Sequence, residues 1–110
     1  MIQAIVLTFL ASLMGTNGVP HFVVGISARE YPNLTGNSPT RNAVGGLVAF
    51  VIAGALIVVA QVGEHPWSAA IAGVLGALVM TVFHAGGGAF RLNRRFGKPM
   101  PSSGTLSSGA

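Results

Sequence analysis

The sequence predicts an all-α membrane protein in which three transmembrane helices form a compact bundle. Charged residues make up only 7% of the chain, whereas a water-soluble domain carries about 25%. Hydrophobic residues make up 51%, and they gather in long segments without any charge. So few charged side chains cannot cover a water-facing surface, which indicates that lipid surrounds most of the molecule.

The first expected helix covers residues 2–26, a segment without Asp, Glu, Lys or Arg. A bilayer core about 30 Å thick requires about 20 helical residues, so this segment is long enough to span it. Pro20 interrupts the segment, because its ring displaces the carbonyl of Thr16 and its nitrogen has no hydrogen to donate. We therefore expect this helix to be kinked or broken near Gly18 and Pro20.

Residues 43–62 and 67–85 are two further segments without a charged residue, and each is long enough to span a bilayer. Gly63 suits the end of the earlier helix, and Pro66 suits the first turn of the later one. Because the connection is so short, these two helices are expected to form a tight antiparallel hairpin.

Charge predicts how the chain is oriented. The expected membrane domain covers residues 1–98, and residues 99–110, rich in Pro, Ser and Gly, are an expected disordered polar tail. With three spans, the loop over residues 29–41 and the segment after residue 85 lie on one side. All six Lys and Arg residues fall there, which predicts a cytoplasmic C-terminus and an N-terminus outside.

Small residues recur along each expected helix at spacings that place them on one face. The three sets are Ala4, Ala11, Gly18 and Gly25; Gly45, Ala49 and Ala53; and Ala69, Gly73 and Ala77. Helices in lipid associate where small residues let their backbones approach, so these are expected contact faces. Because the chain is small for a membrane fold, we also expect a homo-oligomer or a subunit of a larger membrane complex.

Two histidines inside the apolar segments are the leading candidates for a functional site. His21 and His84 fall at nearly the same depth of their helices, and Asn17 lies one turn from His21. One interpretation is a site for protons, a metal or haem, with Met14 and Met80 as soft ligands for copper or haem iron. The other is that these polar side chains only form hydrogen bonds between helices. The separation of the two rings distinguishes these interpretations.

The composition disfavours several classes of function. The chain has no cysteine, which excludes a thiolate metal site and a thiol nucleophile. Glu30 and Glu64 are the only carboxylate side chains and occupy opposite loops, so no enzyme activity is expected from a pair of carboxylates. A small transporter or channel component is a third interpretation. Small multidrug-resistance transporters, however, have four spans and a membrane-embedded glutamate, which this sequence does not offer.

A basic segment follows the third expected span. Arg91, Arg94, Arg95 and Lys98 recur at spacings that place all four on one face of a helix. We expect this face either to contact anionic lipid headgroups or to act as a solvated anchor that fixes the topology. Its position beside a span makes nucleic acid the less favoured partner.

The run from Asn17 to Phe22, which reads Asn-Gly-Val-Pro-His-Phe, resembles the first span of a family of small, uncharacterised bacterial membrane proteins. Those proteins carry an Asn-x-aliphatic-Pro-His segment, followed by a Ser-Pro loop that leads to an Asn at the start of the second helix. Ser38-Pro39 and Asn42 match that pattern, whereas Gly45-Gly46 departs from an expected Trp-Gly pair. The resemblance implies a bacterial inner-membrane protein and assigns no activity.

Overall fold

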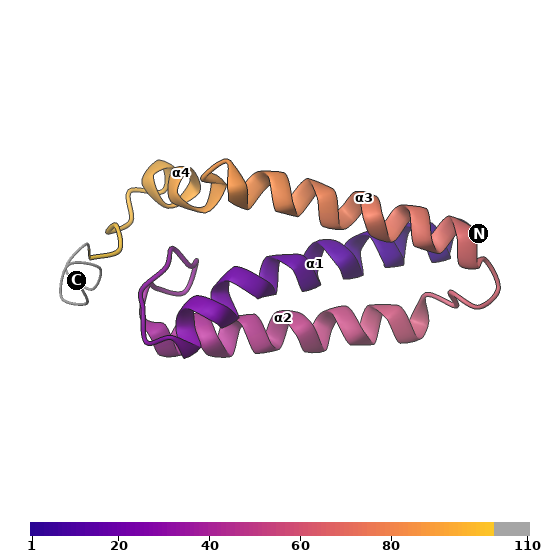
Figure 1. Ribbon diagram of the computed structural model, residues 1–110, viewed down its shortest axis with the longest axis horizontal. Coiled ribbons are helices and arrows are strands. Elements are labelled where there is room, and N and C mark those ends of the chain that lie inside the picture. Colours follow the sequence, from indigo (N-terminus) through magenta and orange to yellow (C-terminus); the bar gives the residue numbers. More distant parts are fainter. Residues whose placement is uncertain (103–110) are drawn as a thin grey trace.

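Three long helices and one short helix make up the architecture of residues 1–102, the part of the chain that this computed structural model describes (Figure 1). The elements are α1 (Ile2–Ile26), α2 (Pro39–Val59), α3 (Pro66–Ala85) and α4 (Gly88–Arg95). The first three are long and apolar enough to cross a membrane, which confirms the predicted all-α membrane fold. The predicted disordered tail falls mostly on residues 103–110, which lie outside the described residues.

Helix α1 lies between α2 and α3 and contacts both, whereas α2 and α3 do not contact each other (Figure 1). The predicted tight hairpin of the second and third spans is therefore wrong. The two helices leave their connecting turn on opposite sides of α1, because α1 offers small residues to both of them. Each thus gains a close backbone approach to α1 in place of a contact with the other.

The contact between α1 and α2 depends on glycines. Gly18 and Gly25 are buried on α1, where Gly18 faces Gly46 of α2 and Gly25 faces Ala43. A Cβ atom on Gly18 would lie 2.9 Å from the carbonyl oxygen of Gly46, and one on Gly25 would overlap the backbone of Ala43. The two backbones therefore pack without intervening side chains, as small residues permit in lipid.

The predicted face of α1 is confirmed, and the faces of the other two helices are confirmed in part. Ala4, Ala11, Gly18 and Gly25 are all buried. The buried residues of α2 are Asn42, Gly46 and Ala49, and those of α3 are Ala69, Ala72 and Gly76. Ala49 and Ala69 belong to the predicted faces and are buried, whereas Gly45, Ala53, Gly73 and Ala77 are only partly covered.

Helix α1 has the predicted bounds, whereas α2 begins and ends earlier than predicted. Helix α1 continues unbroken through Pro20 to Ile26. Helix α2 begins at Pro39 because the side chain of Ser38 caps it, accepting a hydrogen bond from the Arg41 backbone N–H at 3.3 Å. It ends at Val59, and Gln61 takes the left-handed conformation expected of Gly63. The uncharged run does not include the first turn of α2, because that turn contains Arg41.

Helix α4 forms a cap over one end of the bundle. Gly87, with φ of 77°, turns the chain after α3, and Ala89 and Asn93 of α4 are buried. Helix α4 ends at Arg95, so the expected four-residue cationic face is wrong at Lys98. Gly97 reverses the chain in the left-handed conformation, and the Lys98 ammonium donates a hydrogen bond to the Leu34 carbonyl.

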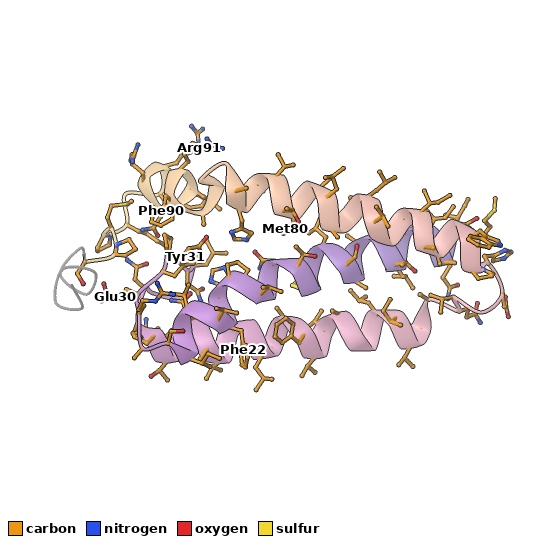
Figure 2. All side chains as sticks on the ribbon, viewed as in Figure 1. Phe22, Glu30, Tyr31, Met80, Phe90 and Arg91 are labelled. Carbon is orange, nitrogen blue, oxygen red and sulfur yellow. The ribbon has the colours of Figure 1, made fainter. Side chains whose placement is uncertain are left out.

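The two ends of the molecule differ in charge. The N-terminus and the turn between α2 and α3 lie at one end, and α4 lies at the other with the loop between α1 and α2 (Figure 1). All six Lys and Arg residues belong to segments at the α4 end, where Arg91 points away from the bundle (Figure 2). Between the ends, large apolar side chains such as Val58 and Val74 are exposed, at 81% and 68%, as on a lipid-facing surface.

Candidate functional site: a polar cluster under the α4 cap

Five polar side chains from all three spans and one loop meet just below α4. They are Asn17 and His21 of α1, Asn42 of α2, His84 of α3 and Tyr31 of the loop that follows α1. The centres of the His21 and His84 rings lie 5.8 Å apart, with the ring planes at 81°. The structure thus brings together all three residues of the predicted intramembrane site and adds two that the sequence did not single out as site residues.

Asn42 is the centre of the cluster and is fully buried. Its amide nitrogen donates to the carbonyl oxygens of Tyr31, Asn37 and Ser38, at 2.8, 3.0 and 3.0 Å. These contacts fix the orientation of the amide, because only the nitrogen can donate to carbonyls. The Asn42 oxygen must therefore face His21, whose Nδ1 lies 2.7 Å away.

This orientation fixes the hydrogens on His21. Because the Asn42 oxygen can only accept, Nδ1 of His21 carries the hydrogen and donates it. In the neutral ring, Nε2 then holds a lone pair. No side chain or backbone group within residues 1–102 forms a hydrogen bond with that nitrogen. A proton added at Nε2 would leave the bond to Asn42 intact.

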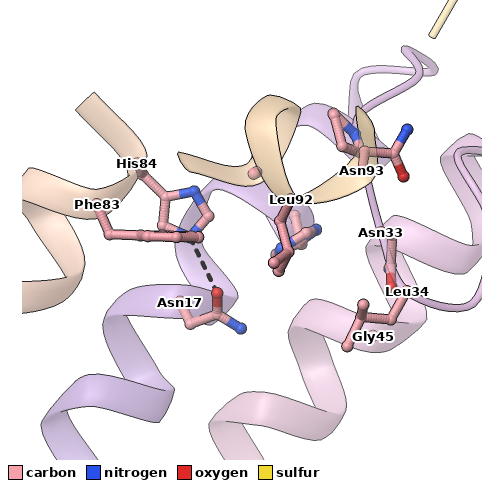
Figure 3. A pocket seen from close by; sticks show the side chains of 11 residues that line it. Asn17, Asn33, Leu34, Gly45, Phe83, His84, Leu92 and Asn93 are labelled. Atoms are coloured by element: carbon pink, nitrogen blue, oxygen red, sulfur yellow. Dashed lines mark hydrogen bonds between the residues drawn. The ribbon is translucent and has the colours of Figure 1, made fainter. Parts of the chain in front are cut away.

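His84 differs from His21 because both of its ring nitrogens are bonded. Nε2 donates to the Asn17 oxygen at 2.9 Å (Figure 3), and Nδ1 accepts from the Tyr31 hydroxyl at 3.1 Å. Protonation of His84 at Nδ1 would reverse this bond, because the Tyr31 hydroxyl would then accept where it now donates. The two histidines therefore have different roles, with His84 positioned by its neighbours and His21 open to one further partner.

Aromatic rings support the cluster from the cap. Phe90 of α4 packs edge-on against Tyr31, with ring centres 5.5 Å apart, beneath the helix (Figure 2). Phe83 packs edge-on against His84 at 5.1 Å. Tyr31 is half-buried, and this burial raises the pKa of its hydroxyl above the ordinary value of 10.0. The Tyr31 hydroxyl is thereby kept in the protonated form that donates to His84.

A cavity of about 170 Å³ opens beside the two histidines (Figure 3). Its polar wall consists of Asn17, His21, Asn33, His84 and Asn93, and its apolar wall consists of Pro32, Leu34, Gly45, Phe83, Ala89 and Leu92. No side chain with a formal charge lines it. The cavity is partly open, and residues of the loop after α1 and of α4 form part of its wall.

The metal and haem interpretation is not favoured by the arrangement of these groups. Within residues 1–102, no three His, Cys, Asp or Glu side chains lie close enough together to share a metal ion. Of the four imidazole nitrogens of His21 and His84, only one is unbonded. Met14 and Met80 are partly buried, but neither lines the cavity. One free nitrogen is far short of the four ligands that a protein site commonly supplies.

The loop after α1 is held by the segment that follows α4. The side chains of Asn37 and Asn93 both donate to the Pro99 carbonyl, each at 2.7 Å. The Ser102 backbone N–H donates to the Glu30 carboxylate at 2.6 Å, which lowers the pKa of Glu30. The loop after α1 and helix α4 are thus joined through hydrogen bonds between residues distant in sequence.

Comparison of the chain with known protein families, with curated proteins and with solved structures finds no match. The resemblance to small bacterial membrane proteins therefore depends on the sequence motif alone. The structure gives its residues physical roles. Asn17 and His21 belong to the polar cluster, Ser38 caps α2, and Asn42 orients the His21 ring.

Proposed function

We propose that this chain is a non-enzymatic protein of a bacterial inner membrane, in which His21 reversibly binds a proton near the cytoplasmic face. The observation that carries this proposal is the free Nε2 of His21 beside an open cavity. Every other imidazole nitrogen of the cluster is bonded within it. Ionisable groups at membrane depth are costly, and a proton relay is one of their established uses.

The orientation is part of this proposal. All six Lys and Arg residues lie at the α4 end, and the opposite end has none, which supports a cytoplasmic location for α4. The cavity then lies near the cytoplasmic end of the bundle. A proton that binds to His21 comes from the cytoplasm and does not cross the apolar half of the bundle.

Histidine NMR tests the proposal directly. In the full chain in detergent micelles, ring ¹⁵N signals report the protonation of each histidine separately. We expect His21 to take up a proton at Nε2 reversibly while its Nδ1–H signal persists, and His84 to keep its neutral form over the same range. If His21 keeps an unprotonated Nε2 down to the pH at which the protein unfolds, the proposal is wrong.

Proton flux distinguishes a transporter or channel component from a protein that only binds. Proteoliposomes with an imposed pH gradient are compared for the unmodified chain, His21→Gln and empty vesicles. Flux that requires His21 would assign transport. Equal leakage in all three, with the NMR titration intact, would assign a binding or sensing role.

A second candidate function is self-association or a subunit role, which a different observation favours. A groove on α1 and α3 is lined by Thr8, Gly73 and Ala77, and the buried Thr8 hydroxyl has no hydrogen-bond partner within residues 1–102. Small residues at such a groove permit another helix to approach closely. Cross-linking in mild detergent, with Gly73→Ile against the control Gly54→Ile, tests this. A monomer in both the unmodified and the control chain would exclude it.

A further inference from the structure

Three side-chain atoms of cavity-lining residues form no hydrogen bond within residues 1–102, namely the Asn17 amide nitrogen, the His21 Nε2 and the Asn93 amide oxygen. Asn17 directs its oxygen at His84 and turns its amide nitrogen away from that ring (Figure 3). His21, one turn further along α1, has an unbonded Nε2. Both residues line the same cavity. A ligand that satisfies both must accept a hydrogen bond at one atom and donate one at a nearby atom.

The size of the cavity limits the ligand. A cavity near 150 Å³ holds a molecule of about the size of benzene, so about 170 Å³ accepts roughly six heavy atoms at most. Phe83, Leu34 and Leu92 form the apolar part of the wall, beside the polar groups. The ligand is therefore small, with a polar end and a short apolar end.

The charge around the cavity favours an anion over a cation. The Lys98 ammonium is bonded to the Leu34 carbonyl, directly behind the cavity wall, and the same end of the molecule carries five arginines. Glu30 is the only acidic residue at this end, and its carboxylate is bonded to the Ser102 backbone N–H. Such a field raises the local concentration of small anions.

We propose that this cavity binds a small monocarboxylic acid, such as acetic or propionic acid, together with one proton on the His21–carboxyl pair. The carboxyl O–H donates to Nε2 of His21, and the carbonyl oxygen accepts from the Asn17 amide. When the acid arrives as its anion, one proton from solution joins the pair, and no other bond forms or breaks. The inference rests on the proposed proton binding at His21, because a nitrogen that cannot take part in proton exchange would not hold an anion.

Titration of the full chain in detergent micelles with ¹³C-labelled acetate tests this inference. Where free His21 is neutral and free acetate is ionised, binding takes up one proton. The apparent affinity for acetate should then fall about ten-fold for each unit that the pH rises. Acetamide has the same shape as acetic acid, with a hydrogen-bond donor and an acceptor, but it does not ionise. It should therefore bind without this pH dependence.

Two matched variants locate the site. Gly45→Leu places a side chain in the cavity and should abolish saturable acetate binding. Gly54→Leu lies on the same helix with nothing within 4 Å and should bind acetate like the unmodified chain. His21→Gln keeps a polar group but cannot exchange a proton, and it should lose saturable acetate binding even if the Gly45 variant fails to fold.

The results of these experiments distinguish the proposed binding of a carboxylic acid from the proposed proton binding at His21. Acetate binding that is absent, independent of pH, or unchanged in Gly45→Leu overturns the ligand assignment. If the His21 ring still titrates in the absence of acetate, the proton-binding proposal stands without it. If the ring does not titrate and acetate does not bind, both are wrong.

Discussion

The Nδ1 atom of His21 lies 2.7 Å from the side-chain oxygen of Asn42, and this bond joins the interior of α1 to the first turn of α2. The same Asn42 side chain holds three backbone carbonyls of the intervening loop. A single amide therefore sets the ring orientation of one histidine and the path of the loop that carries Tyr31. Loss of this amide should affect both stability and the site.

Asn42→Leu is expected to be the most destabilising substitution of a polar residue in the cluster. It leaves the His21 N–H and the loop carbonyls without their partner in a buried position, at a cost of about 2–4 kcal/mol in the free energy of unfolding. Thermal denaturation in detergent measures the change. Asn37→Ala, which removes one side-chain bond to Pro99, is the control and should cost about 1 kcal/mol or less. Equal effects of the two variants would contradict the central role of Asn42.

Glycine substitutions test the close packing of α1 on α2. Gly25→Ala forces a Cβ atom onto the backbone of Ala43, so the helices must separate, and we expect a loss of about 1–3 kcal/mol. Gly54→Ala on α2 meets nothing within 4 Å and should be neutral or stabilise by up to about 1 kcal/mol through helix propensity. Unfolding in mixed micelles provides the measurement. If both variants are equally stable, the backbones do not approach as closely as the structure indicates.

Tyr31 is the only tyrosine, so phenolate absorbance reports its ionisation without interference from another phenol. Burial raises its pKa above 10.0, and the midpoint in the folded protein should exceed that in the chain unfolded by a denaturing detergent. A raised pKa means that the folded state holds the proton more tightly. This contribution to stability is therefore present below pH 10 and is lost as the pH rises through the folded-state midpoint. Identical midpoints in the two states would show that Tyr31 is not buried by the cap.

Much of the fold was predictable because lipid imposes one strong requirement on sequence. A long uncharged run must be helical in a bilayer, and the buried face of α1 follows from the seven-residue spacing of Ala4, Ala11, Gly18 and Gly25. The same reasoning succeeded only in part for α2 and α3, where Ala49 and Ala69 are buried but the other predicted residues are partly covered. Alanine and glycine are so frequent there that adjacent positions offer equally small faces, and only packing against α1 selects Gly46 and Gly76.

The polar cluster was predictable only in part. His21 and His84 stand out because ionisable residues are rare at membrane depth, and their equal depths made a meeting geometrically possible. Tyr31 and Asn42 gave no such signal, since both lie in or next to a polar loop in the sequence. Asn42 becomes a buried residue only because α2 begins four residues earlier than the uncharged run and carries it into the bundle.

Cysteine labelling tests the orientation, and the natural absence of cysteine makes single-cysteine variants straightforward. Thr35→Cys and Met100→Cys lie at the α4 end, and Glu64→Cys lies in the turn between α2 and α3. A membrane-impermeant maleimide added to intact cells should label only Glu64→Cys, and the other two should react after permeabilisation. Labelling of Thr35→Cys and Glu64→Cys from the same side would contradict the three-span topology itself.

The arginines of α4 should give the protein a preference for anionic lipid. Arg91, Arg94 and Arg95 are exposed on this helix, and a basic residue near an anionic surface contributes about 1 kcal/mol at low salt. Replacement of all three by Gln should therefore abolish the selective retention of phosphatidylglycerol over phosphatidylcholine after detergent extraction. Lys98→Gln is the matched control. The Lys98 ammonium is bonded to the Leu34 carbonyl and should therefore stabilise the α4 cap more than it binds lipid. The preference of the unmodified chain should also weaken as salt is raised, since exposed charges are screened. An unchanged lipid preference in the triple variant would indicate that these arginines act only as a solvated anchor that fixes the topology.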